Sequence, residues 1–308
     1  MKTHLAALVL TCTWATWSMA APLNTKQVPA DAKWIVHVDV DAMRESGLVR
    51  MAYERGLERI DAIERHAEQF CLMLGINPED DLHSLTLYGK QFDHEQIVLI
   101  VDADLNQALL AQKVKSAPGY TSQQHGDYEL HSWGGGAGAA TGAFYKPNVM
   151  LLARTPADVA AALDTLQGQS PSLAGAASVL AAPVPSGTML VGRGVGLSAV
   201  PLPYKSPLVK QADSLSLVIG EAHNQVFLNV DFCVQSPDVA QKFKTVIEGA
   251  LAAVELHHGP DSPLTKGAQI LAIGQTGQTV TIRGEAGVND VWREMQILWK
   301  AISAKYLK

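Results

Sequence analysis

The sequence is poor in cysteine and carries no strong excess of either charge. Three cysteines among 308 residues are too few for a disulfide framework, and no Cys-x-x-Cys pair indicates a structural zinc site. The formal net charge is −6, and no run of Lys or Arg exceeds a few residues. This balance argues against a nucleic-acid partner. With 47% hydrophobic residues, the composition fits a soluble globular chain of one large or two ordinary domains.

Catalytic and phosphate-binding motifs are also missing. There is no Gly-x-Ser-x-Gly, and no Ser-x-x-Lys accompanied by its supporting motifs. The glycine-rich stretch 134–142 lacks the Gly-Lys-Ser/Thr of a phosphate loop and joins two predicted strands, where a phosphate loop would have to open a helix. We therefore interpret it as a hairpin connection, and we expect no cofactor.

The N-terminus has the pattern of an export signal. Lys2 supplies the positive charge, Leu5 to Trp17 is uncharged and largely apolar, and Ser18 and Ala20 place small residues before a cleavage point. Cleavage after Ala20 is predicted, which puts the protein in the periplasm or outside the cell. A retained membrane anchor is the alternative, although the apolar stretch is shorter than the roughly 20 residues that a spanning helix needs.

A β-hairpin followed by a helix occurs twice. From Ser214, alternating apolar residues form two strands around a turn at 221–225, and the helical spacing of three and four begins at Ser236. The segment from Ser84 to Ser116 repeats this order, with Leu87 matching Leu217 and Asp102 matching Asp231. We interpret the chain as a tandem duplication.

The predicted fold class is α+β, built from two copies of a β-α-ββ-α-ββ-α unit. Residues 1–20 form the signal peptide, 21–180 the first repeat domain and 181–308 the second, with a boundary in the Ala-, Ser- and Pro-rich segment 173–185. Three prolines in 198–211 replace the long helix that the first copy has after its first strand. We expect antiparallel sheets with helices on one face only, because most strands have one aliphatic and one polar or mixed side.

The polar sides of the strands are the predicted binding face, because the helices are expected to leave them uncovered. The candidate residues are His37, Asp39, Tyr88, His131 and Arg154 in the first copy and Asn229 and Asp231 in the second.

Within that face, His37, Asp39 and Asp41 alternate along one strand, and imidazole with carboxylates suits zinc or manganese. The competing interpretation is a polar sheet face with Asp41 as a helix cap, which we prefer, so no metal site is predicted.

The stretch from Val28 to Asp41 resembles the mature N-terminus of a group of uncharacterised exported bacterial proteins. In that group a Pro-Ala-Asp lead-in, here Pro29-Ala30-Asp31, precedes a strand that ends in acidic residues, and hairpin-helix units repeat along the exported part. The resemblance implies export and a rough architecture. It implies no activity, cofactor or catalytic residue.

We therefore expect a non-enzymatic exported protein that binds another protein or an envelope component, with no membrane span in the mature chain. The alternative is a metal-dependent or other hydrolase that uses His37, Asp39 and His131 on the open face of the first domain. The sequence leaves open the ligand and the oligomeric state. It also leaves open whether Cys71 and Cys233 pair or remain separate thiols.

Overall fold

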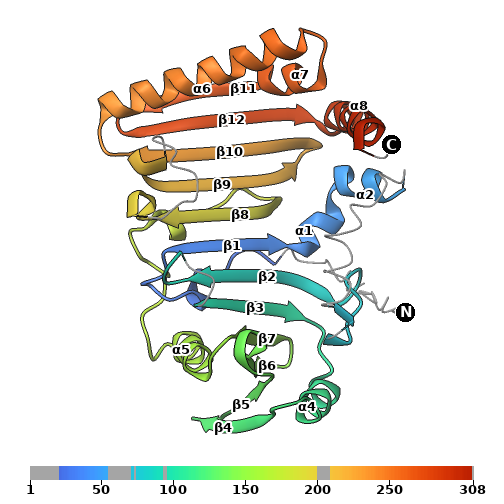
Figure 1. The fold of residues 1–308 in the computed structure, drawn as a ribbon, viewed down its shortest axis with the longest axis vertical. Coiled ribbons are helices and arrows are strands. Elements are labelled where there is room, and N and C mark those ends of the chain that lie inside the picture. The colour runs from blue at the N-terminus through green and yellow to red at the C-terminus, as the bar shows by residue number, and fades with distance from the viewer. Residues whose placement is uncertain (1–20, 55–70, 73, 93–95, 200–208, 307–308) are drawn as a thin grey trace, which may run out of the picture.

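The structure is a computed structural model that describes residues 21–54, 71–72, 74–92, 96–199 and 209–306. Its centre is one twelve-stranded sheet with the order β11-β12-β10-β9-β8-β1-β2-β3-β7-β6-β5-β4 (Figure 1). Every neighbouring pair of strands is antiparallel. The protein is therefore an α+β protein with an antiparallel sheet, as predicted.

The strands of the first half are β1 (Trp34–Asp39), β2 (Leu82–Gly89), β3 (Ile97–Ala103), β4 (Thr121–His125), β5 (Tyr128–Trp133), β6 (Ala140–Lys146) and β7 (Val149–Ala153). Those of the second half are β8 (Thr188–Val195), β9 (Ala212–Ala222), β10 (Gln225–Val234), β11 (Leu271–Thr276) and β12 (Thr279–Gly287). The helices are α1 (Val40–Glu45), α2 (Gly47–Glu54), α4 (Gln107–Lys115), α5 (Pro156–Leu166), α6 (Pro237–His258), α7 (Pro263–Gln269) and α8 (Val288–Tyr306).

The two halves of the chain meet where β1 pairs with β8. This ladder is antiparallel and centred on the pair Val36 and Gly192, and it joins both sets of strands into a single sheet. Outward from this seam the first half runs β1-β2-β3-β7-β6 and the second runs β8-β9-β10-β12-β11. Each half therefore runs outward through three consecutive strands and then a hairpin whose later strand lies nearer the seam, and β5 and β4 extend the first half further.

The hairpins form where the sequence alternates apolar and polar residues. Strands β9 and β10 are joined by the two residues His223 and Asn224, whose φ angles are 53° and 62°. Two consecutive positive φ angles are typical of the type I′ turn that matches strand twist, and Asn tolerates them better than most residues. The predicted strands were confirmed here, and each extends closer to the turn than the alternation indicated.

Helices α5 and α6 begin at caps that the sequence predicts. Thr155 accepts a hydrogen bond from the Asp158 amide, and Ser236 accepts one from the Val239 amide, each with proline at the first helical position. The long helix expected from Asp41 is interrupted at Ser46, between α1 and α2. Asp39 is the residue that caps α1, in place of the predicted Asp41.

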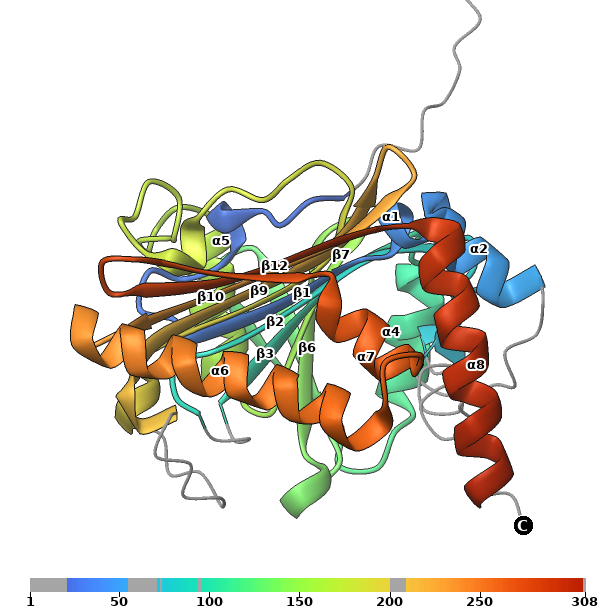
Figure 2. The same cartoon turned by 90° about the horizontal axis from the view of Figure 1, so that it is seen from above.

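Helices cover both faces of the sheet, which corrects the prediction of helices on one face. Helices α4 and α6 lie on one side, called here the α6 side, and α5 lies on the other, the α5 side (Figure 2). Both faces of β3 are apolar: Val98 and Ile100 pack with α5, whereas Val101 packs with Leu110 of α4. A strand buried on both faces loses the alternation by which an open face would be recognised.

Two irregular segments cover the α5 side of the β1–β8 seam. The lead-in, residues 21–33, and the linker, residues 168–187, lie together there: the Leu173 amide donates to the Val28 carbonyl at 2.8 Å, and both side chains are fully buried. Arg193 of β8, only 5% exposed, donates to the carbonyls of Leu180, Ala182 and Pro183. Buried irregular backbone has unpaired carbonyls, and this guanidinium pairs with three of them.

The first half has more strands than the predicted unit. Strand β4 consists of Thr, Ser, Gln and His, without an apolar residue to mark it. Strand β6 overlaps the stretch interpreted as a glycine-rich connection, because small residues gave no alternation. In the second half, α7 also lies outside the predicted unit. Among the helices within the described ranges, none is long and apolar enough to cross a membrane.

Candidate functional site: an apolar cavity under helix α4

The structure places His37 in the interior, where only 2% of it is exposed. Its Nε2 lies 3.0 Å from the Ala21 carbonyl and its Nδ1 lies 2.8 Å from the Thr86 hydroxyl. Because a carbonyl can only accept, Nε2 carries the proton and Nδ1 accepts from Thr86. Burial lowers the pKa of His37, against the raising effects of the Ala21 carbonyl and Asp39. The imidazole is thus a neutral link between β1 and the lead-in.

The neighbouring carboxylates are engaged in local structure. Asp39 is 1% exposed and accepts from the Ala42 amide at 2.8 Å. Asp41 pairs with Arg44 and lies 3.1 Å from His83 Nδ1. In the part of the chain that the structure describes, no three His, Cys, Asp or Glu side chains come together as a metal site.

The other candidates of the first half are also away from open solvent. Tyr88 is buried, and burial raises the pKa of its phenol, with further raising effects of the Asp158 and Asp31 charges. Arg154 is half-buried and donates to the Gly136 carbonyl at 3.4 Å. The face expected to be open around His37, Asp39 and Tyr88 is therefore covered, by the lead-in, the linker and α5.

The candidates of the second half lie on a more accessible part of the same side. Asn229 and Asp231 alternate along β10 and are half-buried, and Asp231 pairs with the exposed Arg283 of β12. Strand β10 lies five places in the sheet order from β3, which contacts α5. The predicted binding face is thus divided into a covered first part and a partly open second part.

His131 lies apart from all of them, on the α6 side. It belongs to β5, where it pairs with Gly142 of β6. Strand β5 is five places from β1 in the sheet, which corresponds to about 24 Å at the usual strand spacing. Opposite faces and this separation prevent His37, Asp39 and His131 from meeting at one point. His131 instead lines a cavity that the sequence analysis did not find.

Contacts at both ends of α4 fix the helix over the cavity. At the first, Gln107 Nε2 donates to the Lys146 carbonyl at 2.8 Å, at the β6–β7 turn. At the second, the Gly134 amide donates to the Pro118 carbonyl at 2.8 Å, and Gly119 lies so close to Gly134 that an added Cβ would be 2.7 Å from its carbonyl oxygen. Glycine at 119, with φ of 70°, permits this approach.

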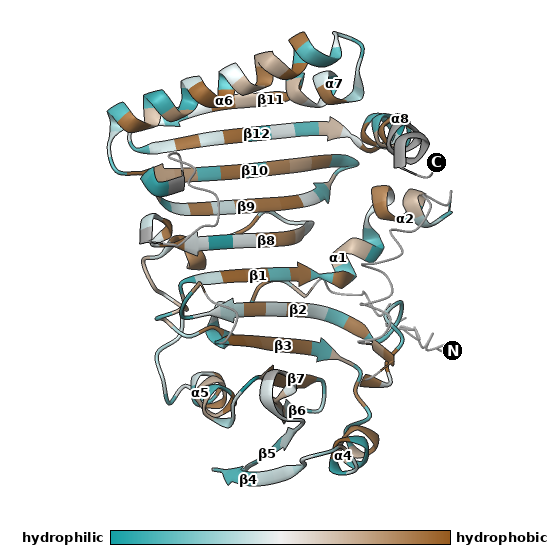
Figure 3. Cartoon of the chain, viewed as in Figure 1, coloured by the Kyte–Doolittle hydropathy of each residue, from teal (hydrophilic) through white to brown (hydrophobic). Residues whose placement is uncertain are grey.

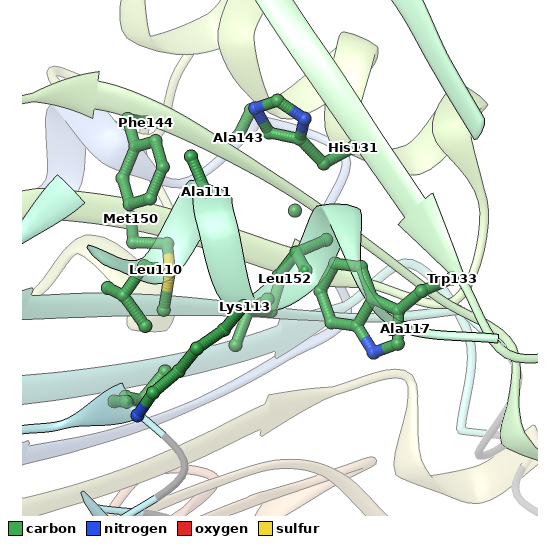
Figure 4. A pocket seen from close by; sticks show the side chains of 13 residues that line it. Leu110, Ala111, Lys113, Ala117, His131, Trp133, Ala143, Phe144, Met150 and Leu152 are labelled. Atoms are coloured by element: carbon green, nitrogen blue, oxygen red, sulfur yellow. The ribbon is translucent and has the colours of Figure 1, made fainter. Parts of the chain in front are cut away.

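The space beneath the middle of α4 has a volume of about 350 Å³. Figure 4 shows side chains from α4 and from strands β5, β6 and β7 pointing into it. Most are aliphatic or aromatic, and they include Leu110, Phe144, Met150, Leu152 and Trp133. Gly142 also lines the cavity, and a side chain there would be crowded, since an added Cβ would be 2.9 Å from Leu152. A volume of this size lies within the range of small-molecule sites.

The polar groups at the cavity are few. Lys113 of α4 is exposed at the rim, and its Nζ lies beside Gly75, where an added Cβ would be 3.5 Å away. His131 Nδ1 lies 3.0 Å from the Tyr120 hydroxyl, and its Nε2 lies 3.8 Å from Glu129. Burial lowers the pKa of His131; the Glu129 charge raises it by less, and the Lys115 charge lowers it further. The described lining includes no Asp or Glu side chain.

The two cysteines of the predicted mature chain are separate thiols. Cys71 is buried beside α4 in the same apolar cluster as Leu110, and Cys233 is half-buried on β10. Burial raises the pKa of Cys71, which disfavours its thiolate.

Comparison with known proteins identifies no family. No protein-family model matches the sequence, and the search of curated proteins found no match. Crystal form III of TP0453 matches with a TM-score of 0.49 and 10% identity, over 89% of this chain and 98% of that chain. Crystal form I of TP0453 matches with a TM-score of 0.45 and 10% identity, over 91% and 99%. At these values the similarity says nothing about a ligand or an activity.

Proposed function

We propose that this chain is an exported, non-enzymatic binding protein that takes an apolar ligand into the cavity under α4. The observation that carries the proposal is the cavity itself, which is lined by aliphatic and aromatic side chains from four elements. Ligand sites are typically concave, mostly apolar spaces of about 300 to 1,000 Å³, so a space of about 350 Å³ with specific contacts at both ends of α4 supports a binding role.

The hydrolase alternative depended on His37, Asp39 and His131 acting together. His37 and Asp39 are buried in hydrogen bonds to the lead-in and to α1, and His131 lies across the sheet. No observation favours this alternative over binding. The half-buried pair Asn229 and Asp231, with Arg283, stays a candidate surface for an envelope or extracellular protein partner.

Export is part of the same proposal. The expected cleavage point precedes Ala21, and the Ala21 carbonyl already accepts the hydrogen bond of buried His37. The packed part of the chain thus reaches back to the residue at which the mature protein is expected to begin.

We also propose that the two halves are copies of one ancestral unit. The strand registers support this. Ser84 pairs with Asp39 at the C-terminal end of β1, and Ser214 pairs with Val195 at the C-terminal end of β8. The β6–β7 and β11–β12 hairpins both turn through two residues, and equivalent positions recur after about 130 residues. In these registers Leu87 corresponds to Leu217, but Asp102 corresponds to Cys233, two residues from the predicted Asp231.

Binding is tested with mature protein and the neutral fluorescent probe N-phenyl-1-naphthylamine. We expect saturable one-to-one binding that weakens about tenfold or more in Ala111→Phe, because this residue lines the cavity and phenylalanine fills it. The matched control is Ala108→Phe, an exposed position on the same helix, which should bind as the wild type does. Absence of saturable binding, or equal binding by the two variants, contradicts the proposal.

A further inference from the structure

The cavity differs from an unselective apolar void in the arrangement of its polar groups. Leu110 and Met150 are almost fully buried, whereas Lys113 is exposed at the rim. In Figure 4 the Lys113 side chain runs along one side of the cavity, and its nitrogen lies away from His131. One end of the space is therefore cationic and open to solvent, and the remainder is apolar.

The available polar groups are donors. Among the described residues, neither Lys113 Nζ nor Trp133 Nε1 has a hydrogen-bond or ion-pair partner, and neither group can accept a hydrogen bond in these states. Glu129 lies on the His131 side of the cavity, with a carboxylate oxygen 3.8 Å from Nε2, and the described lining holds no Asp or Glu side chain. A ligand group placed near Lys113 would therefore be an acceptor, and preferably an anion.

The volume favours one apolar chain of medium length. At about 350 Å³, the space lies near the lower end of the range of small-molecule sites. Placing such a chain among Leu, Met and Phe side chains removes apolar surface from water, which is the main source of affinity.

We propose that the cavity binds a single-chain anionic amphiphile, with a medium-length acyl chain beneath α4 and its carboxylate at Lys113. This inference rests on the proposed binding function and specifies its ligand class. A space of this size favours one chain over two long chains, and a cationic head group would meet Lys113 with the same charge. Lys113 acts as the group that selects the head, and the apolar lining supplies most of the affinity.

The experiment measures displacement of bound N-phenyl-1-naphthylamine from mature protein by decanoate and by 1-decanol, at low and high salt. We expect decanoate to bind more tightly than decanol, and Lys113→Met to weaken decanoate about fivefold without changing decanol. Lys115→Met, an exposed lysine on the same helix outside the cavity lining, is the matched control and should change neither affinity by more than about twofold.

The outcomes separate the two proposals. If the probe binds and both ligands compete equally in wild type and Lys113→Met, the cavity is a binding site but the head-group assignment is wrong. Equal losses of decanoate affinity in Lys113→Met and Lys115→Met would reduce the effect to the general charge of α4 and would also overturn it. If no probe binds, the binding function fails together with its ligand class.

Discussion

The Ser46 hydroxyl donates a 2.6 Å hydrogen bond to the carboxylate of Glu221, across a sequence separation of 175 residues. The same carboxylate accepts from the amides of Gly47 and Leu48, both at 3.0 Å. Glu221 at the end of β9 therefore caps helix α2, a task that a residue next to the helix usually performs.

Replacing Glu221 with Ala should lower the free energy of unfolding by about 2 kcal/mol, because three donors lose a charged acceptor. Glu221→Gln should recover part of this loss, since its amide oxygen still accepts. Urea denaturation gives these values, and Glu255→Ala, an exposed position on α6, is the control. A midpoint for Glu221→Ala equal to that of the control would show that the cap does not stabilise the fold.

Phe243 on α6 is 5% exposed, and its ring centroid lies 5.1 Å from that of Phe232 on β10. Phe243→Ala should cost about 3 to 5 kcal/mol, the usual range for removing a buried aromatic ring. Lys244→Ala should stay within about 0.5 kcal/mol, because its ion pair with Glu248 is a surface pair. Chemical denaturation compares the two, and an unchanged midpoint for Phe243→Ala would remove this residue from the core.

His37 predicts a pH dependence of stability. Its pKa in the folded protein is below the ordinary value of 6.5, because burial disfavours the charged ring and outweighs the Ala21 carbonyl and Asp39. The unfolded chain therefore takes up the proton first, and folding stability falls as the pH drops below 6.5.

In His37→Gln this part of the pH dependence should disappear, while the neutral amide can still link to the lead-in. Denaturation midpoints measured from pH 8 to about pH 5 provide the comparison, since this range brackets the ordinary histidine pKa. Parallel curves for wild type and variant would contradict the prediction.

The cysteines should react as two free thiols, with buried Cys71 alkylated by iodoacetamide more slowly than half-buried Cys233. Cys71 is buried and burial raises its pKa, so its thiolate is scarce. Mass spectrometry of partly alkylated native protein identifies the residue that reacts first. A disulfide-linked peptide containing both cysteines would contradict the separation seen between them.

Protein recovered from the exported fraction should begin at Ala21, as the small residues at Ser18 and Ala20 predict. Intact mass and N-terminal sequencing decide this. An N-terminus at Met1 in a membrane fraction would instead favour the retained anchor.

The sequence predicted those strands and helices whose own residues show alternation or a helix cap. The hairpins from Ser84 and Ser214 were readable because apolar residues alternate along each strand, and α5 and α6 were readable from their caps. Strand β4 was missed because it has no apolar residue, and its position depends on pairing with β5.

Lateral order and burial were harder to predict, because they depend on distant partners. Helix α6 packs against β11 and β12 as well as β10, because these two strands continue the sheet beyond β10. Val246 lies three residues after buried Phe243, a spacing that predicts the same face of the helix, yet it is exposed. Figure 3 shows hydrophobic residues along the central strands. The sequence analysis expected helices to cover such residues on one face of the sheet.

The prediction of an open binding face around His37 was wrong for a similar reason. Its covering segments have no periodic pattern, and their carbonyls pair with His37 and Arg193 only in the folded state. The cavity gave no signal in the sequence, since it depends on contacts of Gln107 and Gly119 that fix α4 over the strands. Polar residues that alternate with apolar ones on a strand can thus form hydrogen bonds to irregular backbone segments and be covered from solvent by them.

The pairing of β1 with β8 sets the order in which this protein can complete its sheet. During synthesis or export from the N-terminus, β1 can pair with β2 after residue 89 is available, but its other edge stays open until Thr188–Val195 arrives. For that interval the first half has an unpaired strand in what becomes the middle of the sheet, and such an edge invites pairing with a second chain. Chains truncated between residues 167 and 187 should therefore associate with one another more readily than the full-length chain does.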